Sequence, residues 1–188
     1  MIKRIFDIFS SLALIIIISP LLLLTAIAIK RDSEGPVLFK QKRPGLKNDL
    51  FVIYKFRSMS VDTPNIESAK LGQGVSYITP VGKIIRKTSI DELPQLVNVV
   101  KGDMSVVGPR PALYNQYELI EKRTELGIDK VKPGITGYAQ VMGRDDINDD
   151  QKVQYDKYYI DNQSFKLDIW IIWKTIKNVL TSKGVKHW

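Results

Sequence analysis

The chain has 188 residues, of which 44% are hydrophobic and 26% charged, so it is long enough for one folded domain with an appendage and too hydrophobic for a wholly disordered chain. Lys and Arg number 28 against 20 Asp and Glu, a net charge of +8, which favours a negatively charged partner: nucleic acid, anionic lipid or a phosphorylated substrate. There is no cysteine and one histidine, His187, which excludes disulfides, thiolate metal sites and a Ser-His-Asp relay.

The strongest single signal lies near the start of the chain. Residues 12–29 read LALIIIISPLLLLTAIAI, an uncharged run of 18 residues, and a run of this length predicts a membrane-inserted helix. A cleaved signal peptide fits less well, because no small-x-small cleavage site follows the run before Lys30 and Arg31. A buried core helix is also disfavoured, because a small domain seldom surrounds so many consecutive Ile and Leu residues.

The run is interrupted near its middle by Ser19 and Pro20. Proline lacks an N–H group and its ring clashes with the carbonyl four residues earlier, so we expect a kink, with the Ser19 hydroxyl satisfying a freed backbone group. Basic residues flank the run on both sides and draw both ends toward the cytoplasm. The residues alone leave two topologies open: a re-entrant hairpin that returns to the same membrane face, and an ordinary kinked span.

The segment after this run predicts a β-hairpin beside the membrane. Two β-type stretches, 37–39 and 50–56, are separated by the turn-forming residues 43–45. Residues 30–57 carry eight Lys or Arg and three acidic residues, a balance that suits contact with anionic lipid headgroups. Residues 60–76 are expected to form a loop.

Two helices are predicted next. Thr79 followed by Pro80 is a helix start, and a second helix is expected from Ser89 to about Lys101, before the stop signal Gly102. The second helix would carry two adjacent acidic residues in its first turn.

The rest of the chain predicts turns and further helices. Residues 108–111 and 133–137 are rigid turns rich in Pro and Gly. The charge balance inverts over 145–161, which holds six Asp and two Lys residues. Apolar residues recur at helical spacing from 165 to 179, with Trp and Lys at the edges of the apolar face. This last helix either lies at the membrane interface or packs on the protein core.

Asp91 and Glu92 are the candidate reactive pair, and two interpretations compete. In the first, Ser89 and Glu92 form a capping box and Asp91 merely benefits from the helix N-terminus; the residues alone favour this one. In the second, the pair lies beside backbone N–H groups and Arg86, where a phosphoryl group would bind, so that a carboxylate attacks phosphorus or holds a divalent metal. An acidic pair among excess Lys and Arg suits phosphoryl transfer.

Several sequence blocks together resemble one protein family. In chain order they are a K-R-hydrophobic-F-D start, the Ser-Pro break, KQKRPG (40–45), YKFRSM (54–59), IRKTSIDELPQLVNVVKGDMSVVGPRP (85–111), KPGITGYAQVMGR (132–144) and YDKYY (155–159). Essentially from end to end, the chain resembles the bacterial monotopic phosphoglycosyl transferases, the bacterial sugar transferase family. Members transfer a sugar 1-phosphate from a UDP-sugar to undecaprenyl phosphate and release UMP.

The resemblance implies roles for individual residues. Asp91 matches the nucleophile, which forms a phosphosugar-aspartyl intermediate while Mg²⁺ neutralises the diphosphate. Glu92 matches the second acid of the dyad, in metal binding or proton handling. The other matches are basic or polar positions around the phosphates: Lys55, Arg86, Arg110, Arg144 and Asp156. For these five a purely structural role stays open, such as pinning a turn or capping a helix.

The resemblance also implies an architecture. We expect an α+β fold, a mostly helical small domain with a short β-hairpin. Residues 1–31 would form a re-entrant membrane hairpin broken at the Ser-Pro pair, and residues 32–188 a catalytic domain with interfacial helices on the cytoplasmic face of the bacterial plasma membrane. Residues 112–125 and 140–159 are most similar to capsular polysaccharide transferases that use an N-acetylated deoxyamino sugar. The expected partners are a UDP-sugar, undecaprenyl phosphate and membrane lipid; a homo-oligomer is left open.

Two other classes of protein compete with an enzyme. A membrane-tethered, non-catalytic module would bind lipid or a partner through the basic hairpin and use the acidic pair only as a cap. A nucleic-acid binder is disfavoured, because it leaves the apolar run unexplained and because the acidic segment splits the basic residues. Release of UMP from UDP-sugars in the presence of undecaprenyl phosphate and Mg²⁺ separates an enzyme from the first of these.

Overall fold

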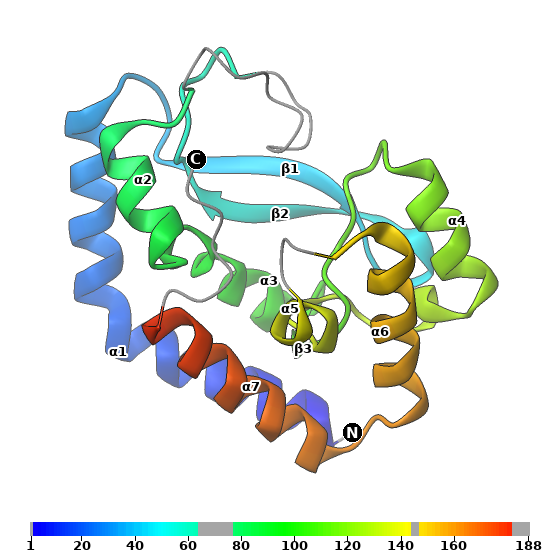
Figure 1. The fold of residues 1–188 in the computed structure, drawn as a ribbon. Helices are drawn as coiled ribbons and strands as arrows, with labels where there is room; N and C mark the ends of the chain where they lie inside the picture. The colour runs from blue at the N-terminus through cyan, green and yellow to red at the C-terminus, as the bar shows by residue number, and fades with distance from the viewer. Residues whose placement is uncertain (1, 64–76, 144–146, 182–188) are drawn as a thin grey trace.

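The computed structural model describes residues 2–63, 77–143 and 147–181. Helices surround two small sheets (Figure 1). The predicted α+β class is confirmed in its coarse form, because the described chain is mostly helical, has little sheet and begins with a long apolar helix. Most of the predicted loop, 64–76, and the candidate residue Arg144 lie outside the described residues.

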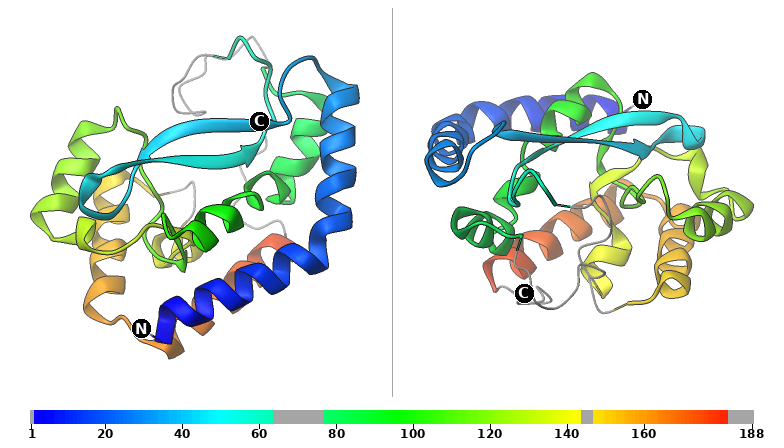
Figure 2. Two further views of the ribbon diagram at one scale, coloured as in Figure 1. Left: turned by 180° about the vertical axis from the view of Figure 1, so that it is seen from behind. Right: turned by 90° about the horizontal axis from the view of Figure 1, so that it is seen from above.

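The N-terminal helix α1 (Ile2–Asp32) bends near its middle, as several views show (Figures 1 and 2). Pro20 lies inside it and has no N–H to give to the carbonyl of Ile16. The Ser19 hydroxyl donates to that carbonyl instead, at 2.8 Å, as predicted. Helical structure continues on both sides, so the break is a bend within one helix. The helix is long and apolar enough to cross a membrane, and 11% of its most apolar 18-residue window is buried by the protein.

The first part of α1 packs against the rest of the protein. Asp7 is buried and accepts hydrogen bonds from the Ser105 hydroxyl at 2.7 Å and from the Val106 N–H at 3.1 Å. Lys3 forms an ion pair with Asp168 at 2.5 Å. Polar residues at the start of the apolar helix therefore join it to the folded domain, a role that the sequence did not indicate. The division of the chain at residue 31 stays a prediction.

The predicted hairpin is confirmed, but the turn expected at 43–45 is wrong, because the first strand continues through Pro44 and the positive φ values of the turn fall on Lys47 and Asn48. β1 (Leu38–Pro44) and β2 (Leu50–Phe56) pair antiparallel, and the 3₁₀ turn η1 (Leu46–Asn48) joins them. Ile53 and Phe56 of β2 are buried. They pack against helices that follow in the chain, so the hairpin covers the segment between residues 85 and 99.

Helix α2 (Pro80–Lys87) begins as predicted. Thr79 caps it, because its side chain accepts a hydrogen bond from the Gly82 N–H at 3.0 Å. A Cβ at Gly82 would lie 2.0 Å from the carbonyl oxygen of Ser58, so only glycine lets the start of α2 approach the end of β2 this closely. Phe56 joins the buried cluster that α2 forms with α1.

The helix predicted from Ser89 is wrong at its start. Residues 90–92 form a single 3₁₀ turn, η3 (Ile90–Glu92), and α3 (Gln95–Lys101) begins after Pro94. Pro94 has no N–H to donate to the carbonyl of residue 90, so α-helical hydrogen bonding cannot run through it. Ser89 has a φ of 57° and makes no capping hydrogen bond, so the capping-box interpretation is also wrong.

A second sheet was not predicted. β3 (Ser105–Val107) pairs in parallel with β4 (Gly134–Thr136). The turn predicted at 108–111 follows β3, but the turn predicted at 133–137 is wrong at its centre, because residues 134–136 form β4 itself. The two segments pack so closely that a Cβ on Gly134 would lie 2.1 Å from the backbone nitrogen of Gly108. Strands of three residues are too short to produce a readable alternation of apolar and polar residues, which explains why the sequence did not show them.

The remaining helices are α4 (Tyr117–Glu125), the 3₁₀ turn η4 (Ile128–Lys130), α5 (Tyr138–Met142), α6 (Asp149–Asp161) and α7 (Phe165–Leu180). Their buried residues fall in two clusters, one formed with α4, η4 and α6, and one with β3, α6 and α7. A third cluster joins β2 to α3. The site therefore lies on elements that several small clusters support, rather than over one large core.

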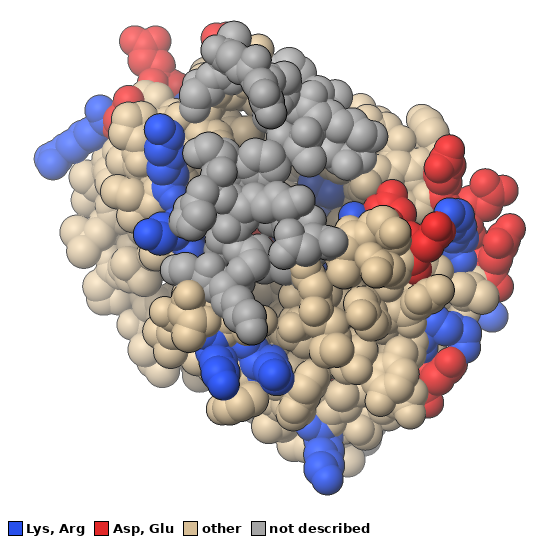
Figure 3. Space-filling view, viewed as in Figure 1, with Lys and Arg blue, Asp and Glu red and all other residues tan. Residues whose placement is uncertain are grey.

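The last helix, α7, has two different faces. Ile171 is fully buried, whereas Trp173 and Ile176 are 53% and 55% exposed, and the ammonium group of Lys174 lies 5.5 Å from the centre of the Trp170 ring. The helix therefore packs on the core and also presents an exposed apolar face, and its position at the membrane interface stays a prediction. In the same view as Figure 1, the surface over much of α1 is uncharged, basic side chains stand out along α7, and acidic side chains gather over α4 and α6 (Figure 3).

Candidate active site

Asp91 and Glu92 lie on the η3 turn, which contacts both α2 and β2. Ser89 turns the chain out of α2: its N–H donates to the carbonyl of Arg86 at 3.1 Å, and its carbonyl accepts from the Glu92 N–H at 3.2 Å. Its φ of 57° is uncommon for a residue other than glycine. The acidic pair is therefore on a tight turn that faces the hairpin, and not at the start of an α-helix.

Glu92 is held by two cations from distant parts of the chain. Lys55 of β2 donates to Oε1 at 2.9 Å. Arg110, which follows β3, donates from Nη1 to Oε2 at 3.1 Å and from Nη2 to Oε1 at 2.5 Å. Burial acts to raise the pKa of Glu92, but the charges and hydrogen bonds of Arg110 and Lys55 outweigh it and hold the pKa well below its usual range. Glu92 is thus a fixed anion.

Asp91 has a different environment. Its carboxylate makes no hydrogen bond or ion pair with another side chain within the described part of the chain. Burial first, and then the neighbouring charge of Glu92, raise the pKa of Asp91 to about 6, against the opposing effects of Lys55, Arg86 and Arg110. Two adjacent carboxylates whose surroundings push their pKa values apart are suited to separate chemical roles.

Arg86 lies in the last turn of α2, near Asp91. Its charge is among those that lower the pKa of Asp91, and its guanidinium contacts the sulfur of Met59 at 3.7 Å. A cation in this position can neutralise an anionic group that approaches Asp91. The structure thus brings together Asp91, Glu92, Lys55, Arg86 and Arg110.

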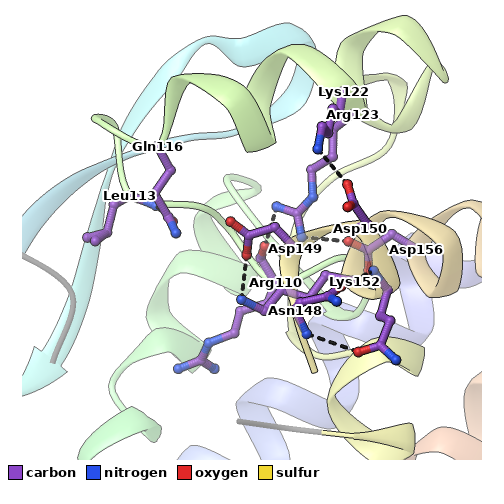
Figure 4. A network of polar contacts seen from close by, with 11 residues as sticks. Arg110, Leu113, Gln116, Lys122, Arg123, Asn148, Asp149, Asp150, Lys152 and Asp156 are labelled. Carbon is purple, nitrogen blue, oxygen red and sulfur yellow. Dashed lines mark hydrogen bonds and ion pairs between the residues drawn. The ribbon is translucent and has the colours of Figure 1, made fainter. Parts of the chain in front are cut away.

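Asp156 reaches this cluster only through another residue. It is buried on α6 and forms an ion pair with Arg123 of α4 at 2.5 Å. Arg123 also donates to the backbone carbonyl of Arg110 at 2.9 Å, and Figure 4 shows its guanidinium lying between Asp156 and the Arg110 segment. Asp156 and Arg123 therefore support the chain that carries Arg110. The sequence did not single out Arg123, because its partners lie 13 and 33 positions away.

Arg43 is a second residue that sequence reasoning missed as a site component, although it lies in the KQKRPG block. Together with Gln95 and the two cations that bind Glu92, Lys55 and Arg110, it lines a small cleft that is open to solvent. Burial and the charge of Arg110 lower the pKa of Arg43 to about 10, which leaves it cationic at neutral pH. The sequence predicted a turn at Arg43, whereas the structure places it in β1, and the direction of its side chain depends on the hairpin register.

Metal-binding capacity in the described residues is limited to small sets of ligands. The ranges 2–63, 77–143 and 147–181 contain no group of three or more His, Cys, Asp or Glu residues that could hold an ion. Mg²⁺, however, is commonly bound by one or two carboxylates together with substrate phosphates. Asp91 fits that pattern, whereas both oxygens of Glu92 are engaged by Lys55 and Arg110.

The fold and the site define a class: a protein with a long apolar N-terminal helix, whose clustered cations and acidic pair suit reactions of phosphorylated substrates. The chain belongs to the bacterial sugar transferase family, whose family model matches residues 1–182. The resemblance inferred from the sequence blocks is confirmed.

Individual relatives agree with this assignment. The chain is 43% identical over 185 residues to the "Uncharacterized sugar transferase EpsL" of Bacillus subtilis, covering 98% of this chain and 90% of EpsL. It is 43% identical over 190 residues to the UDP-N-acetylgalactosamine-undecaprenyl-phosphate N-acetylgalactosaminephosphotransferase of Aeromonas hydrophila, covering 98% and 45%. It is 40% identical over 197 residues to the undecaprenyl-phosphate galactose phosphotransferase of Salmonella typhimurium, covering 97% and 41%. The chain thus spans less than half the length of the last two.

Proposed function

We propose that this protein transfers a sugar 1-phosphate from a UDP-sugar to undecaprenyl phosphate and releases UMP. The observation that carries the proposal is the contrast within the acidic pair: Glu92 is fixed by two cations, while Asp91 has a pKa of about 6 and no side-chain partner in the described chain. The activities for which the Aeromonas and Salmonella relatives are named support the lipid acceptor and the type of transfer.

The proposed reaction has two displacement steps at one phosphorus atom. In the first, a carboxylate oxygen of Asp91 attacks the β-phosphorus of the UDP-sugar; the bond from that phosphorus to the bridging oxygen breaks, and UMP leaves with the bonding electrons. The sugar phosphate is then an acyl phosphate on Asp91. In the second step an oxygen of undecaprenyl phosphate attacks the same phosphorus, and Asp91 leaves as a carboxylate.

The cations around the pair are proposed to bind and neutralise the phosphates. Lys55, Arg86 and Arg110 lie close enough to Asp91 to influence its pKa, and Arg144 is proposed for the same task on the family resemblance alone. We assign Glu92 the role of holding Lys55 and Arg110 in place, so that little reorganisation is needed when charge develops on the transferring group.

Mg²⁺ is the proposed cofactor, held by Asp91 together with substrate oxygens. When bound, it would neutralise charge on the diphosphate. The residues of the chain do the rest: Asp91 supplies the attacking oxygen, and the cations orient the diphosphate in line with it.

For the membrane topology we propose a re-entrant α1, which enters one leaflet and returns, leaving the folded domain on the cytoplasmic face of the bacterial plasma membrane. The bend at Pro20 and the basic residues at both ends of the apolar run support it. The exposed apolar face of α7 would lie at the same surface, since Trp and Lys side chains favour the headgroup region.

Topology is testable because the chain has no cysteine, so one introduced thiol is unique. Ile2→Cys and Ser33→Cys place it at the two ends of α1. We expect a membrane-impermeant thiol reagent to label both variants only from the cytoplasmic side, in inverted vesicles. Labelling of Ile2→Cys from the outer side of intact cells would show that α1 spans the membrane.

The covalent mechanism is tested by incubating the enzyme with a UDP-sugar labelled at the β-phosphate and no lipid acceptor. We expect one equivalent of UMP and a labelled protein in the wild type, and neither in Asp91→Asn, with folding and membrane association retained. UMP release without protein labelling would disprove the aspartyl intermediate. Absence of UMP release from every UDP-sugar in the wild type, with and without undecaprenyl phosphate and Mg²⁺, would favour the non-catalytic lipid-binding module.

The same assay addresses the donor. The expected sugar is an N-acetylated deoxyamino sugar, and the expected pathway is the first membrane step of capsule, O-antigen or glycoconjugate synthesis. A screen of UMP release over UDP-sugars that differ at C2, C4 and C6 measures which donor has the highest kcat/KM.

A further inference from the structure

One face of the β-hairpin carries three residues of a charged cleft. The antiparallel register pairs Gln41 with Ile53, Phe39 with Lys55 and Arg43 with Phe51. Because paired residues of antiparallel strands point to the same side, Arg43, Ile53 and Lys55 share one face. These three, together with Gln95, Arg110 and Pro111, line a small cleft that is open to solvent.

The charges around this cleft do not balance. Arg43, Lys55 and Arg110 are cations, and Glu92 is the carboxylate that pairs with two of them. The charge of Glu92 raises the pKa of Arg43, but it has a smaller effect than burial and the repulsion of Arg110, which lower that pKa. Asp91 adds a second carboxylate near Lys55 and Arg110, so among the described residues three cations lie around two carboxylates, and a further anion would neutralise the remaining positive charge.

Two buried hydrogen-bond donors at the cleft have no partner in the described chain. Gln95 is 1% exposed, and its side-chain Nε2 makes no hydrogen bond. The buried Nε of Arg43 makes none either, and its Nη1 reaches the carbonyl of Pro111 only at 3.4 Å. Buried donors without partners are uncommon and costly, so a pair of them beside a cationic cleft indicates that an acceptor belongs there.

We propose that Arg43 and Gln95, with Lys55 and Arg110, form a second phosphate subsite, next to the position where Asp91 attacks phosphorus. The proposal extends the transferase function above by separating the phosphorus that reacts from a phosphate group that is only held. A guanidinium and an amide N–H suit the oxygens of a phosphate ester. The phosphate has two possible sources in the proposed reaction: the uridine-linked phosphate of the donor and the phosphate of the lipid acceptor.

The test is equilibrium binding, which needs no chemistry. Two probes are used with the full-length protein in detergent micelles: UMP, and a short-chain polyprenyl phosphate. The variants are Arg43→Met, Arg43→Lys and Gln95→Met. Lys42→Met is the matched control, because Lys42 is the adjacent, exposed residue on the opposite face of β1 and its loss removes the same charge. Melting curves show whether each variant is folded.

Loss of one charge-assisted hydrogen bond should weaken binding about tenfold. If affinity for UMP falls about tenfold in Arg43→Met and severalfold in Gln95→Met, with Lys42→Met unchanged and Arg43→Lys intermediate, the subsite holds the nucleotide phosphate. If only the affinity for polyprenyl phosphate falls in that pattern, it holds the acceptor phosphate. Unchanged affinity for both probes in folded Arg43→Lys and Gln95→Met would overturn the proposal. Failure of the covalent mechanism would appear separately, as absence of the labelled protein.

Discussion

At the scale of single residues, the two acidic groups of the site differ because their neighbours differ. Glu92 accepts hydrogen bonds from two cations, Lys55 and Arg110, whereas Asp91 is buried beside the negative charge of Glu92. A carboxylate with a pKa of about 6 is mostly ionised at neutral pH and is more basic than an ordinary aspartate. It is therefore a stronger nucleophile, and it stays available because no other described side chain binds it.

The pKa of Asp91 predicts the pH dependence of the first step. Only the ionised carboxylate can attack, and the pKa of Asp91 is about 6. Formation of the labelled protein should therefore slow about tenfold per pH unit below that pKa. Single-turnover release of UMP between pH 5 and 8, at saturating UDP-sugar, measures this. A rate constant that stays flat down to pH 5 would contradict the assignment of Asp91 as nucleophile.

The same pKa predicts that Asp91 lowers stability at neutral pH. Its folded-state pKa of about 6 lies above the ordinary value of 3.8, so the folded protein favours the protonated form, and stability falls as pH rises from about 4 to 6. Asp91→Asn should therefore raise the free energy of unfolding by about 1–3 kcal/mol at pH 7.5 and have little effect below pH 4. Denaturant melts at both pH values test this.

Glu92→Gln is the matched comparison and should act in the opposite direction. It leaves the charges of Lys55 and Arg110 without their carboxylate, at a cost of about 2–4 kcal/mol. Equal stability changes of the same sign in Asp91→Asn and Glu92→Gln would show that the two carboxylates do not differ as described.

At this scale the sequence was informative about residue type and less so about partners. It singled out Asp91, Glu92, Lys55 and Arg110, and the structure places them together. It did not indicate that Glu92 binds cations rather than capping a helix, because the partners lie 37 and 18 positions away. Contacts over such separations depend on the tertiary fold and leave no local pattern.

At the scale of secondary-structure elements, local rules worked where the chain has strong local signals. Thr79-Pro80 starts a helix, and Gly102 with a φ of 99° ends one, as predicted. The helix expected from Ser89 failed because Pro94 interrupts it and Ser89 takes a left-handed conformation. At this position the backbone restriction imposed by Pro94 outweighs the capping preference of Ser89.

The bend in α1 gives a testable prediction for an element. Pro20→Ala supplies an N–H for the carbonyl of Ile16, removes the ring clash and should straighten the helix. If the bend returns the chain to one face, Ile2→Cys in this background should become accessible from the outer side of the membrane. Ser19→Ala keeps the proline and should keep the wild-type labelling. Identical labelling of Pro20→Ala and wild type would show that the bend does not set the topology.

At the scale of the whole molecule, the apolar helix and the site-bearing domain are joined by polar contacts near the N-terminus. Arg4 donates to the carbonyls of Val99 and Val100 at the end of α3, at 2.5 and 2.9 Å, where a cation also suits the helix dipole. Asp7 accepts hydrogen bonds from β3, and Lys3 forms an ion pair with Asp168 of α7. The first half of α1 is thus continuous with the domain, and in the proposed topology its position in the membrane would set the height of the site above the bilayer.

Asp7 is the residue through which this coupling can be tested. Asp7→Ala removes the acceptor of both the Val106 N–H and the Ser105 hydroxyl, so we expect a loss of about 2–4 kcal/mol in unfolding free energy. If the coupling also sets the height of the site, the KM for undecaprenyl phosphate should rise several-fold more than the KM for the UDP-sugar, because only the lipid is confined to the bilayer. Asp49→Ala, at an exposed position after the hairpin turn, is the control and should change neither quantity. Equal rises in both KM values for Asp7→Ala would show that Asp7 does not act on the lipid acceptor in particular, and a fall in apparent kcat with both KM values unchanged would indicate a general loss of folded enzyme. An unchanged melt would show that the Asp7 contacts do not hold the helix to the domain.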